Sequence, residues 1–227
     1  MGVVFNFDPH TKQGSHLVAM FADFRSGGIY YFDSYGYKPK PEIAELLKRI
    51  HSQGNQMIYK QGVAGLQKMR DTHTVACNVK SITPEVVKFE CLEFVKGLHV
   101  GDLVGAAYVK KIGKHKQLCK HIHSVRFVKA IDHRKKLVTL DAPLTDKCNV
   151  LVHKGFKIYV NKNRHQFKHS ECGTYAIHFI ARLLLERPFK EVSGKIILDD
   201  DMRKHRTYFY RPNMDSKNED WLSILNT

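Results

Sequence analysis

The N-terminal part of the chain contains two apolar runs that predict neighbouring β-strands. Residues 16–24 (HLVAMFADF) and 29–33 (IYYFD) are rich in β-branched and aromatic side chains and are joined by the four residues RSGG. Gly-Gly between such runs indicates a hairpin. The following segment, EIAELLKRIHSQG, has apolar residues at helical spacing, so we predict a helix that begins after Pro41 and that Gly54 ends.

The middle of the chain changes character at about residue 72. It contains the short β-rich runs VVKFECLEFV, DLVGAAYV, HSVRFVKAID, KKLVTLD and NVLVH, separated by glycines and by the basic stretch HRKK. Short strands at regular spacing without helices indicate a small antiparallel barrel or sandwich. Residues 72–153 contain fourteen Lys and Arg against seven Asp and Glu. We therefore interpret 72–153 as an inserted, basic, all-β module.

The C-terminal part returns to mixed structure. Residues 155–160 (GFKIYV) predict a strand, and a polar loop leads to CGTYAIHFIARLLLER, whose apolar positions predict a largely buried helix that Pro188 ends. A shorter helix is expected around 194–206. The fold class is therefore α+β, with a discontinuous core of residues 1–71 and 154–227 around the inserted module.

Composition limits the function classes. The 227 residues carry a net charge of +15, which favours polyanions and makes nucleic acid a candidate partner; a merely soluble basic surface is the alternative. The chain has no run of eighteen apolar residues, and its first twenty residues include Asp8, Lys12 and His16, so neither a membrane span nor a secretory signal is predicted. We expect a soluble, non-secreted protein. Five cysteines, an odd number, argue against a disulfide framework.

One of these cysteines, Cys172, lies where a nucleophile is expected. It opens the predicted helix, with Ser170 as a natural N-cap, and the helix dipole at that end favours a thiolate. Gly173 lets a substrate approach the backbone closely. A buried structural cysteine is the alternative interpretation.

A thiolate nucleophile needs a base and a group that orients the base. His16 stands at the start of the first strand of the hairpin and Asp33 at the end of the second, so the two should meet at one edge of a sheet. Asp33 would then hold the imidazole tautomer. Gln166, six residues before Cys172, could donate its side-chain amide to an oxyanion beside the backbone N–H of Cys172.

The combination resembles a known superfamily. The segment GSH up to His16, the hairpin, YYFDS around Asp33, and QFKHSEC from Gln166 to Cys172 before a hydrophobic helix are similar to the Ulp1/SENP and adenovirus-protease (adenain, clan CE) cysteine proteases. The base precedes the nucleophile, unlike the order in papain-like enzymes. The segments FDSYGYKP, NKNRHQFKHSECGTYAIHFI and LDDDMRKHRTYFYRP look most like the Ulp1-like proteases of nucleocytoplasmic large DNA viruses, of the African swine fever virus type. The resemblance covers roughly residues 5–71 and 154–211.

This resemblance implies a core with a central mixed sheet flanked by helices and a hydrolase that needs no cofactor. It implies cleavage of a peptide or isopeptide bond after a Gly-Gly-type sequence, with a polyprotein or a protein carrying a ubiquitin-like modifier as substrate. In viruses such an enzyme usually matures core or capsid polyproteins, which places it in the virion or in the viral factory of the host cytoplasm.

Three features depart from the family pattern. Leu17 stands where relatives usually have tryptophan, only fifteen residues precede His16 where relatives carry a substantial segment, and residues 72–153 have no counterpart in the usual core. They favour an alternative, a catalytically weak basic protein that docks nucleic acid or virion components. Removal of ubiquitin-like modifiers from host proteins is a further alternative with the same chemistry.

The inserted module also offers a candidate zinc site. Cys119, His121 and His123 alternate, so on a strand they share a face, and Cys148 or His153 could complete a ligand set. The spacing is not a usual zinc pattern, and a histidine-rich basic strand is the favoured interpretation. We expect no metal and no cofactor.

Overall fold

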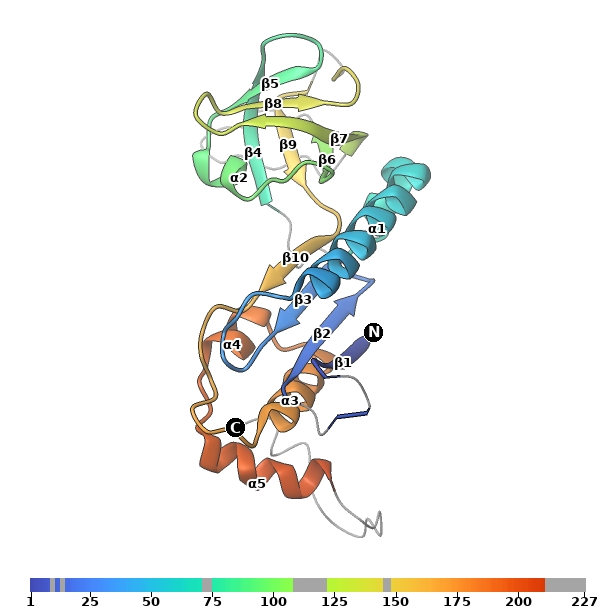
Figure 1. The fold of residues 1–227 in the computed structure, drawn as a ribbon. Helices are drawn as coiled ribbons and strands as arrows, with labels where there is room; N and C mark the ends of the chain where they lie inside the picture. Colours follow the sequence, from blue (N-terminus) through green and yellow to red (C-terminus); the bar gives the residue numbers. More distant parts are fainter. Residues whose placement is uncertain (9–10, 13–14, 71–74, 108–121, 145–147, 211–227) are drawn as a thin grey trace, which may run out of the picture. The chain divides into compact units, whose positions relative to one another are not determined.

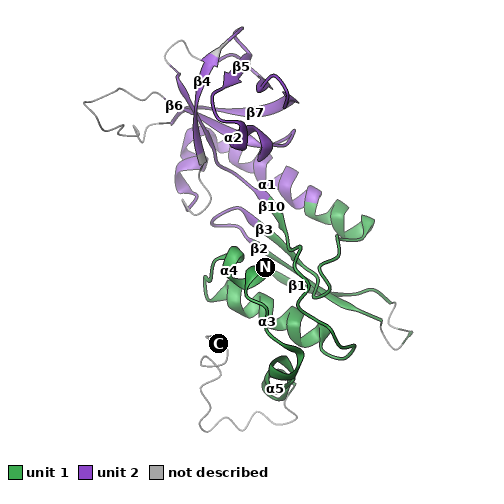
Figure 2. Ribbon diagram, turned by 90° about the vertical axis from the view of Figure 1, so that its left-hand side faces the viewer, with its two compact units in different colours: residues 1–22, 29–47, 158–227 green, residues 23–28, 48–157 purple. Residues whose placement is uncertain are grey.

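The computed structural model describes residues 1–8, 11–12, 15–70, 75–107, 122–144 and 148–210, and shows the α+β fold that the sequence predicts (Figure 1). The chain divides into two compact units (Figure 2). The first comprises residues 1–22, 29–47 and 158–227, and the second residues 23–28 and 48–157. This division gives most of the long first helix to the second unit. The boundaries that the sequence predicts, at 71/72 and 153/154, stay a prediction.

The first unit is built on a four-stranded mixed sheet in the order β1-β2-β3-β10. The strands are β1 (Gly2–Asn6), β2 (Leu17–Asp23), β3 (Gly28–Phe32) and β10 (Lys157–Val160). β1 and β2 are antiparallel, with Val4 opposite Ala19. The backbone bonds of β10 to β3 advance in the same direction along both strands, from Lys157 N–H to Gly27 O and from Asn161 N–H to Tyr31 O, so this pair is parallel. β1 is not predicted from the sequence, because its apolar run, Val3 to Phe5, is only three residues long.

Three helices follow the sheet in the chain and complete this unit: α3 (Cys172–Leu184), α4 (Phe189–Gly194) and α5 (Asp199–Phe209) (Figure 1). The apolar side of α3 packs on the sheet because Tyr175, Phe179 and Leu183 recur at helical spacing. Phe179 stacks on Phe32 with ring centroids 4.7 Å apart. The buried cluster that joins the sheet and the helices consists of Ala19, Phe21, Tyr30, Phe32, Tyr175, Ala176, Phe179, Leu183, Val192 and Met202.

The second unit contains a closed six-stranded barrel, as the pattern of short strands predicts. The strands are β4 (Val75–Ser81), β5 (Val86–Phe89), β6 (Leu103–Ala107), β7 (Ile122–Asp132), β8 (Leu137–Leu140) and β9 (Val150–His153). They close in the order β4-β5-β8-β7-β6-β9, and β4 pairs with β9 to complete the circle. Alternate residues point inward and form the core, which includes Val79, Val87, Phe89, Val104, Val138 and Leu151.

The long helix α1 (Pro41–Lys68) corrects the prediction that Gly54 ends it. Gly54 lies inside the helix, and a Cβ there would come within 2.5 Å of the Phe156 ring. The glycine is therefore a packing residue that lets a buried ring touch the helix backbone, not a helix stop. The helical conformation is interrupted later, at Gly62, where φ is 61°.

Three smaller predictions are also corrected. The module expected to lack helices contains α2 (Leu92–Lys96), and its first strand, β4, was not predicted. The single helix expected at 194–206 is instead the pair α4 and α5, with residues 195–198 between them. Of the described cysteines, Cys77, Cys91, Cys148 and Cys172 are free. Among the described residues, no helix is long and apolar enough to cross a membrane.

The contact of Gly54 with Phe156 gives a test of stability. Gly54→Ala adds a methyl group against a ring that is 1% exposed, so overpacking should outweigh the helix propensity gained. We expect the free energy of unfolding, measured with urea and circular dichroism, to fall by about 1–3 kcal/mol. Gly97→Ala is the matched control, because the nearest atom to its new Cβ would be 3.5 Å away. Equal effects of the two substitutions would contradict this role of Gly54.

Candidate active site

The β2–β3 hairpin brings His16 and Asp33 together, as its geometry predicts. His16 precedes β2 and Asp33 follows β3, and His16 Nε2 lies 3.0 Å from Asp33 Oδ1. The Asp33 side chain is fully buried and His16 is 9% exposed. A carboxylate oxygen accepts, so Nε2 carries the proton and the other ring nitrogen, Nδ1, is left for a second partner.

Asp33 is fixed by its own loop and by Asn161, which follows β10. Asn161 accepts from the Asp33 backbone N–H through Oδ1 at 2.8 Å and donates from Nδ2 to the Asp33 carbonyl at 2.9 Å. The Tyr35 backbone N–H donates to Asp33 Oδ1 at 2.7 Å. Asn161 is itself 2% exposed, so it fixes the backbone of Asp33 from within the core. Nothing in the local sequence distinguished this asparagine from an ordinary loop residue.

Cys172 is the first residue of α3, at the positive end of the helix dipole. The predicted N-cap was wrong: the capping position is Glu171, without a side-chain cap bond, and Ser170 Oγ instead donates to Glu171 Oε1 at 3.0 Å. Glu171 is buried and lies 3.4 Å from Arg203 Nε, which ties the start of α3 to α5. The position of the thiol thus depends on an ion pair that the sequence did not reveal.

The Cys172 thiol and the His16 imidazole interact and shift one another's pKa. Burial opposes charge on the thiol, but hydrogen bonds from His16 and the Leu17 backbone N–H, together with the imidazolium charge, lower the pKa of Cys172. Burial likewise opposes the imidazolium, but Asp33 and Cys172 raise the pKa of His16 to about 9. Both shifts favour the thiolate–imidazolium pair over the neutral pair, and the thiolate is the reactive form of a cysteine nucleophile.

Gln166 is a buried residue of the loop before α3. Its Oε1 accepts from Ser34 Oγ at 2.6 Å, and its Nε2 donates to the Lys168 carbonyl at 2.5 Å. A carboxamide has two N–H groups, and these contacts use one of them. Because Ser34 directly follows Asp33, the loop that carries Asp33 also holds the amide that the sequence predicts as an oxyanion donor.

The same loop is held from two helices. Asp199, the first residue of α5, accepts from the backbone N–H groups of Phe167 and Lys168 through Oδ2 at 2.9 Å each. The Tyr175 hydroxyl of α3 lies 3.2 Å from the His165 carbonyl of this loop and 2.7 Å from the Ile197 carbonyl. Asp199 and Tyr175 are therefore positioning residues for the loop, and the sequence gave no spacing signal for either.

Aromatic residues surround the thiol. The Tyr35 ring lies 4.8 Å from the His16 ring, and the nearby Cys172 charge contributes, after burial, to a raised pKa of Tyr35. A Cβ on Gly173 would lie 2.6 Å from the Tyr210 hydroxyl and 2.9 Å from Leu17 Cδ1. Gly173 is therefore closely flanked by two side chains, and a glycine is what fits between them.

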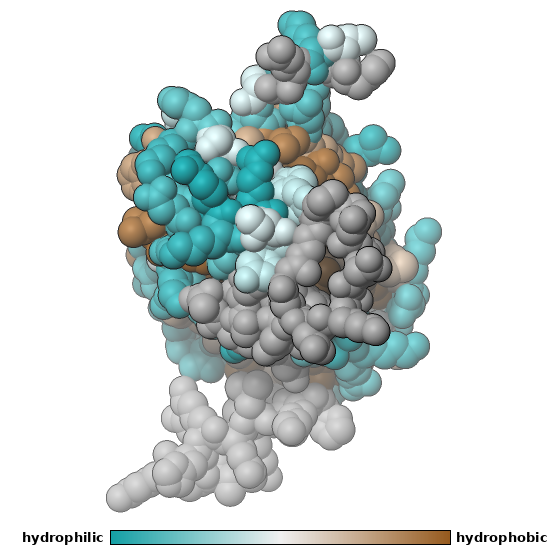
Figure 3. All heavy atoms as spheres, turned by 90° about the horizontal axis from the view of Figure 1, so that it is seen from below, coloured by the Kyte–Doolittle hydropathy of each residue, from teal (hydrophilic) through white to brown (hydrophobic). Residues whose placement is uncertain are grey.

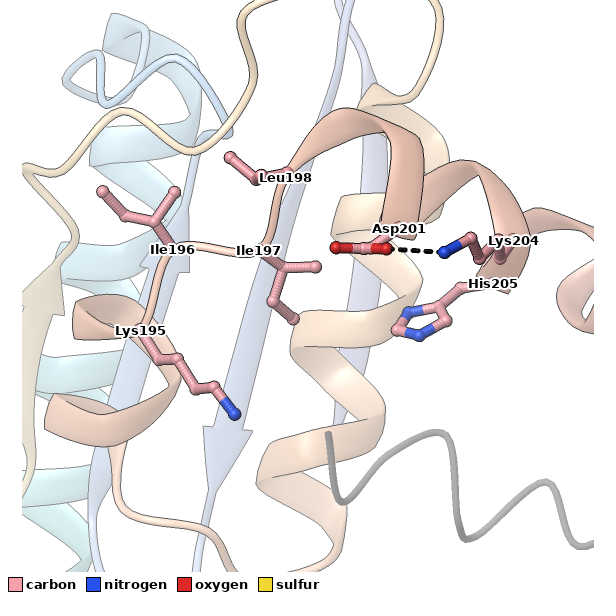
Figure 4. A pocket seen from close by; sticks show the side chains of 7 residues that line it. All are labelled: Lys195, Ile196, Ile197, Leu198, Asp201, Lys204 and His205. Atoms are coloured by element: carbon pink, nitrogen blue, oxygen red, sulfur yellow. Dashed lines mark hydrogen bonds and ion pairs between the residues drawn. The ribbon is translucent and has the colours of Figure 1, made fainter.

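The surface beside α5 carries a pocket that is separate from the predicted site residues. The side seen from below in Figure 3 is mainly hydrophilic where it is described, which agrees with the exposed charged residues of α5. A pocket of about 570 Å³ adjoins α5, and in it Asp201 is paired with Lys204 at 2.8 Å (Figure 4). It is lined by Lys195, Ile196, Ile197, Leu198, Asp201, Lys204 and His205, and so by none of the four predicted site residues.

Of the candidate zinc ligands, Cys119 and His121 lie outside the described residues. Within the part of the chain that the structure describes, no group of three His, Cys, Asp or Glu side chains is arranged to hold a metal ion.

Comparison with known proteins gives one partial relative. The chain is 36% identical over 73 residues to a protein of Acanthamoeba polyphaga mimivirus named a "putative thiol protease". The match covers 30% of this chain and 24% of the mimivirus protein, so it spans about a quarter of that relative's length. No family model and no solved structure matches the chain. The chain thus resembles a viral thiol protease over part of its length.

The thiolate–imidazolium pair predicts the pH dependence of alkylation. Iodoacetamide reacts with the thiolate, so the rate at Cys172 should reach half of its plateau below the pH of an ordinary thiol, about 8.5. His16→Ala removes the charge and the hydrogen bond that lower the pKa of Cys172 while burial remains, so the midpoint should move to higher pH. Mass spectrometry of each cysteine peptide measures the rates, with the exposed Cys91 as internal control. An unchanged midpoint in the variant would contradict the pair.

The close packing at Gly173 predicts a second effect. Gly173→Ala should displace the ends of the Tyr210 and Leu17 side chains, which are flexible, and so disturb the thiol more than the fold. We expect labelling of Cys172 by a thiol-directed electrophile to slow about tenfold or more, which corresponds to an activation free energy higher by about 1.4 kcal/mol. The urea midpoint should change little. Gly194→Ala, where a new Cβ would meet nothing within 4 Å, is the control. Full reactivity in the Gly173 variant would refute this.

Proposed function

We propose that the protein is a thiol-dependent peptidase of the Ulp1/adenain type, with Cys172 as nucleophile and His16 as general base. Asp33 orients His16, and Gln166 together with the Cys172 backbone N–H stabilises the oxyanion. The observation that carries the proposal is that His16 interacts with a buried carboxylate through Nε2 and with the helix-end thiol, and that both pKa shifts favour the ion pair. A structural cysteine does not require such a partner.

In the proposed reaction the Cys172 thiolate attacks the scissile carbonyl carbon, and the carbonyl oxygen becomes an oxyanion. The N–H of Cys172 has no acceptor inside the helix because it belongs to the first turn, so it is available to the oxyanion. The His16 imidazolium gives its proton to the leaving amine, which departs and leaves a thioester. His16 then takes a proton from water, whose oxygen attacks the thioester carbonyl. The C–S bond breaks, the acyl part leaves as a carboxylic acid, and the thiolate–imidazolium pair is restored.

Two observations support this assignment beyond the geometry. The partial relative from mimivirus is named as a thiol protease, and the match is consistent with the same chemistry here. Leu17 stands where the resembled family usually has tryptophan, yet its backbone N–H still donates to the Cys172 sulfur. The substitution therefore changes a wall of the site without removing a contact to the nucleophile.

For the substrate, we propose a peptide or isopeptide bond that follows a Gly-Gly-type sequence, in a viral polyprotein. This part rests on the family resemblance alone. A protein carrying a ubiquitin-like modifier would be cleaved by the same four residues and differs only in the group recognised beyond the scissile bond.

The experiment compares fluorogenic Gly-Gly-X peptides with Gly-Val-X peptides and with a ubiquitin-like protein joined to a fluorophore. Turnover of the Gly-Gly peptides that disappears in Cys172→Ala is the expected result. Preference for the folded modifier by a hundredfold would move the assignment to the isopeptidase alternative. Turnover that persists in Cys172→Ala would remove Cys172 from the nucleophile role. Absence of any turnover, with the Cys172 thiol still reactive, would favour the catalytically weak basic binding protein.

Gln166 provides a separate prediction of rate. Gln166→Glu keeps the shape and an oxygen that accepts from Ser34, but it loses the N–H donor, so kcat should fall about a hundred- to a thousandfold with KM little changed. Lys162→Ala, an exposed change in the same loop, is the control and should keep kcat within about twofold. A fall in kcat of less than fivefold in Gln166→Glu would exclude it as an oxyanion donor.

A further inference from the structure

The barrel carries a concave basic surface that the proposed peptidase chemistry does not use. A pocket of about 790 Å³ lies over strands β4, β5 and β8 and the turn between β7 and β8. We call it the barrel groove; it is lined by Lys80, Ile82, Lys88, Phe89, Glu90, Arg134, Lys135, Lys136 and Leu137. Five cationic side chains thus face a single carboxylate.

That carboxylate does not neutralise the groove. Glu90 Oε2 accepts from Asn78 Nδ2 at 2.9 Å, and among the described residues no ion pair joins any of the five cations to an acid. Lys80, Lys88, Arg134 and Lys135 are exposed, so their charges act outward. The groove is therefore a concentrated positive field and not an internal salt-bridge network.

The register of the strands places positive charges opposite one another, which destabilises the unbound protein. Lys80 of β4 pairs directly with Lys88 of β5, and like charges at directly opposed positions of an antiparallel pair are destabilising. Lys136, at the end of the adjoining turn, has a φ of 57°, a left-handed conformation that glycine or asparagine adopts more readily. The opposed pair Lys80 and Lys88 and the turn residue Lys136 thus place lysines where the fold alone favours other residues.

We propose that the barrel groove binds the phosphate backbone of double-stranded nucleic acid. Phosphates placed between Lys80 and Lys88 would turn their repulsion into attraction, and the charge of a duplex, one per 1.7 Å of axis, matches a groove with several fixed cations better than a short acidic peptide does. The +7 excess of residues 72–153 extends the attraction beyond the groove.

The residues that line the groove also favour binding of a duplex over binding of a single strand. Single-strand binding without sequence preference relies on exposed aromatic rings on which bases stack. The one aromatic ring that lines the groove is Phe89, which is 1% exposed, and the exposed apolar residue there is Ile82. The groove therefore contacts backbone and not bases, and binding is independent of sequence.

The test measures fluorescence anisotropy of the full chain with a labelled 30-base-pair duplex over a series of salt concentrations. The triple variant Lys80→Gln, Lys88→Gln, Arg134→Gln should weaken binding at least tenfold and reduce the slope of log K against log salt by about 2.7, which is 0.9 for each lost phosphate contact. The control is Lys60→Gln, Lys68→Gln, Lys129→Gln, which removes the same charge from exposed positions outside the groove. The control should change the affinity less than threefold.

Each other outcome overturns the proposal. Equal losses of duplex affinity in the two variants would mean diffuse electrostatic attraction with no role for the groove. Tenfold tighter binding of a single strand would mean contacts to bases. Stronger binding of polyglutamate than of the duplex would indicate an acidic protein partner. No binding of the duplex at low salt would also refute it. Cys172→Ala should bind like the wild type, and the groove variant should keep its thiol-probe labelling, so this test is independent of the proposed peptidase activity.

Discussion

The candidate site depends on one imidazole with two partners. His16 interacts with the Asp33 carboxylate through Nε2 and with the Cys172 thiol through the other side of the ring. Each partner favours the charged form of the ring, and together they outweigh a burial that would otherwise keep it neutral. The two interactions therefore act together on the imidazole. Loss of either Asp33 or Cys172 would lower the pKa of His16 and so destabilise its charged form.

The surrounding structure supplies rigidity to this contact. Asn161 clamps the backbone of Asp33, Ser34 binds Gln166, and Asp199 holds the two residues that follow Gln166. Sheet, loop and α5 are thus linked by buried hydrogen bonds instead of by apolar packing alone. Such networks specify one arrangement because an unsatisfied buried polar group is costly.

The sequence allowed the hairpin, the helix-end cysteine and the barrel to be predicted, because each follows from a local pattern. His16 and Asp33 are only seventeen residues apart, so the hairpin alone brought them together. Ser34 and Gln166 are 132 residues apart, and their contact depends on the tertiary fold. Gly54 was misread for the same reason, since the ring that explains it belongs to Phe156. The short strand β1 and helix α2 form through pairing and packing, which local propensity does not encode.

The closure of the barrel fixes where the chain enters and leaves it. β4 and β9 are its first and last strands, and they are paired, with Val75 opposite His153. The chain therefore enters and leaves the barrel at neighbouring residues, with Cα atoms about 5 Å apart as in any antiparallel pair. Both ends of the barrel segment thus lie at one point, and the chain on either side needs no long return across the barrel to reach it.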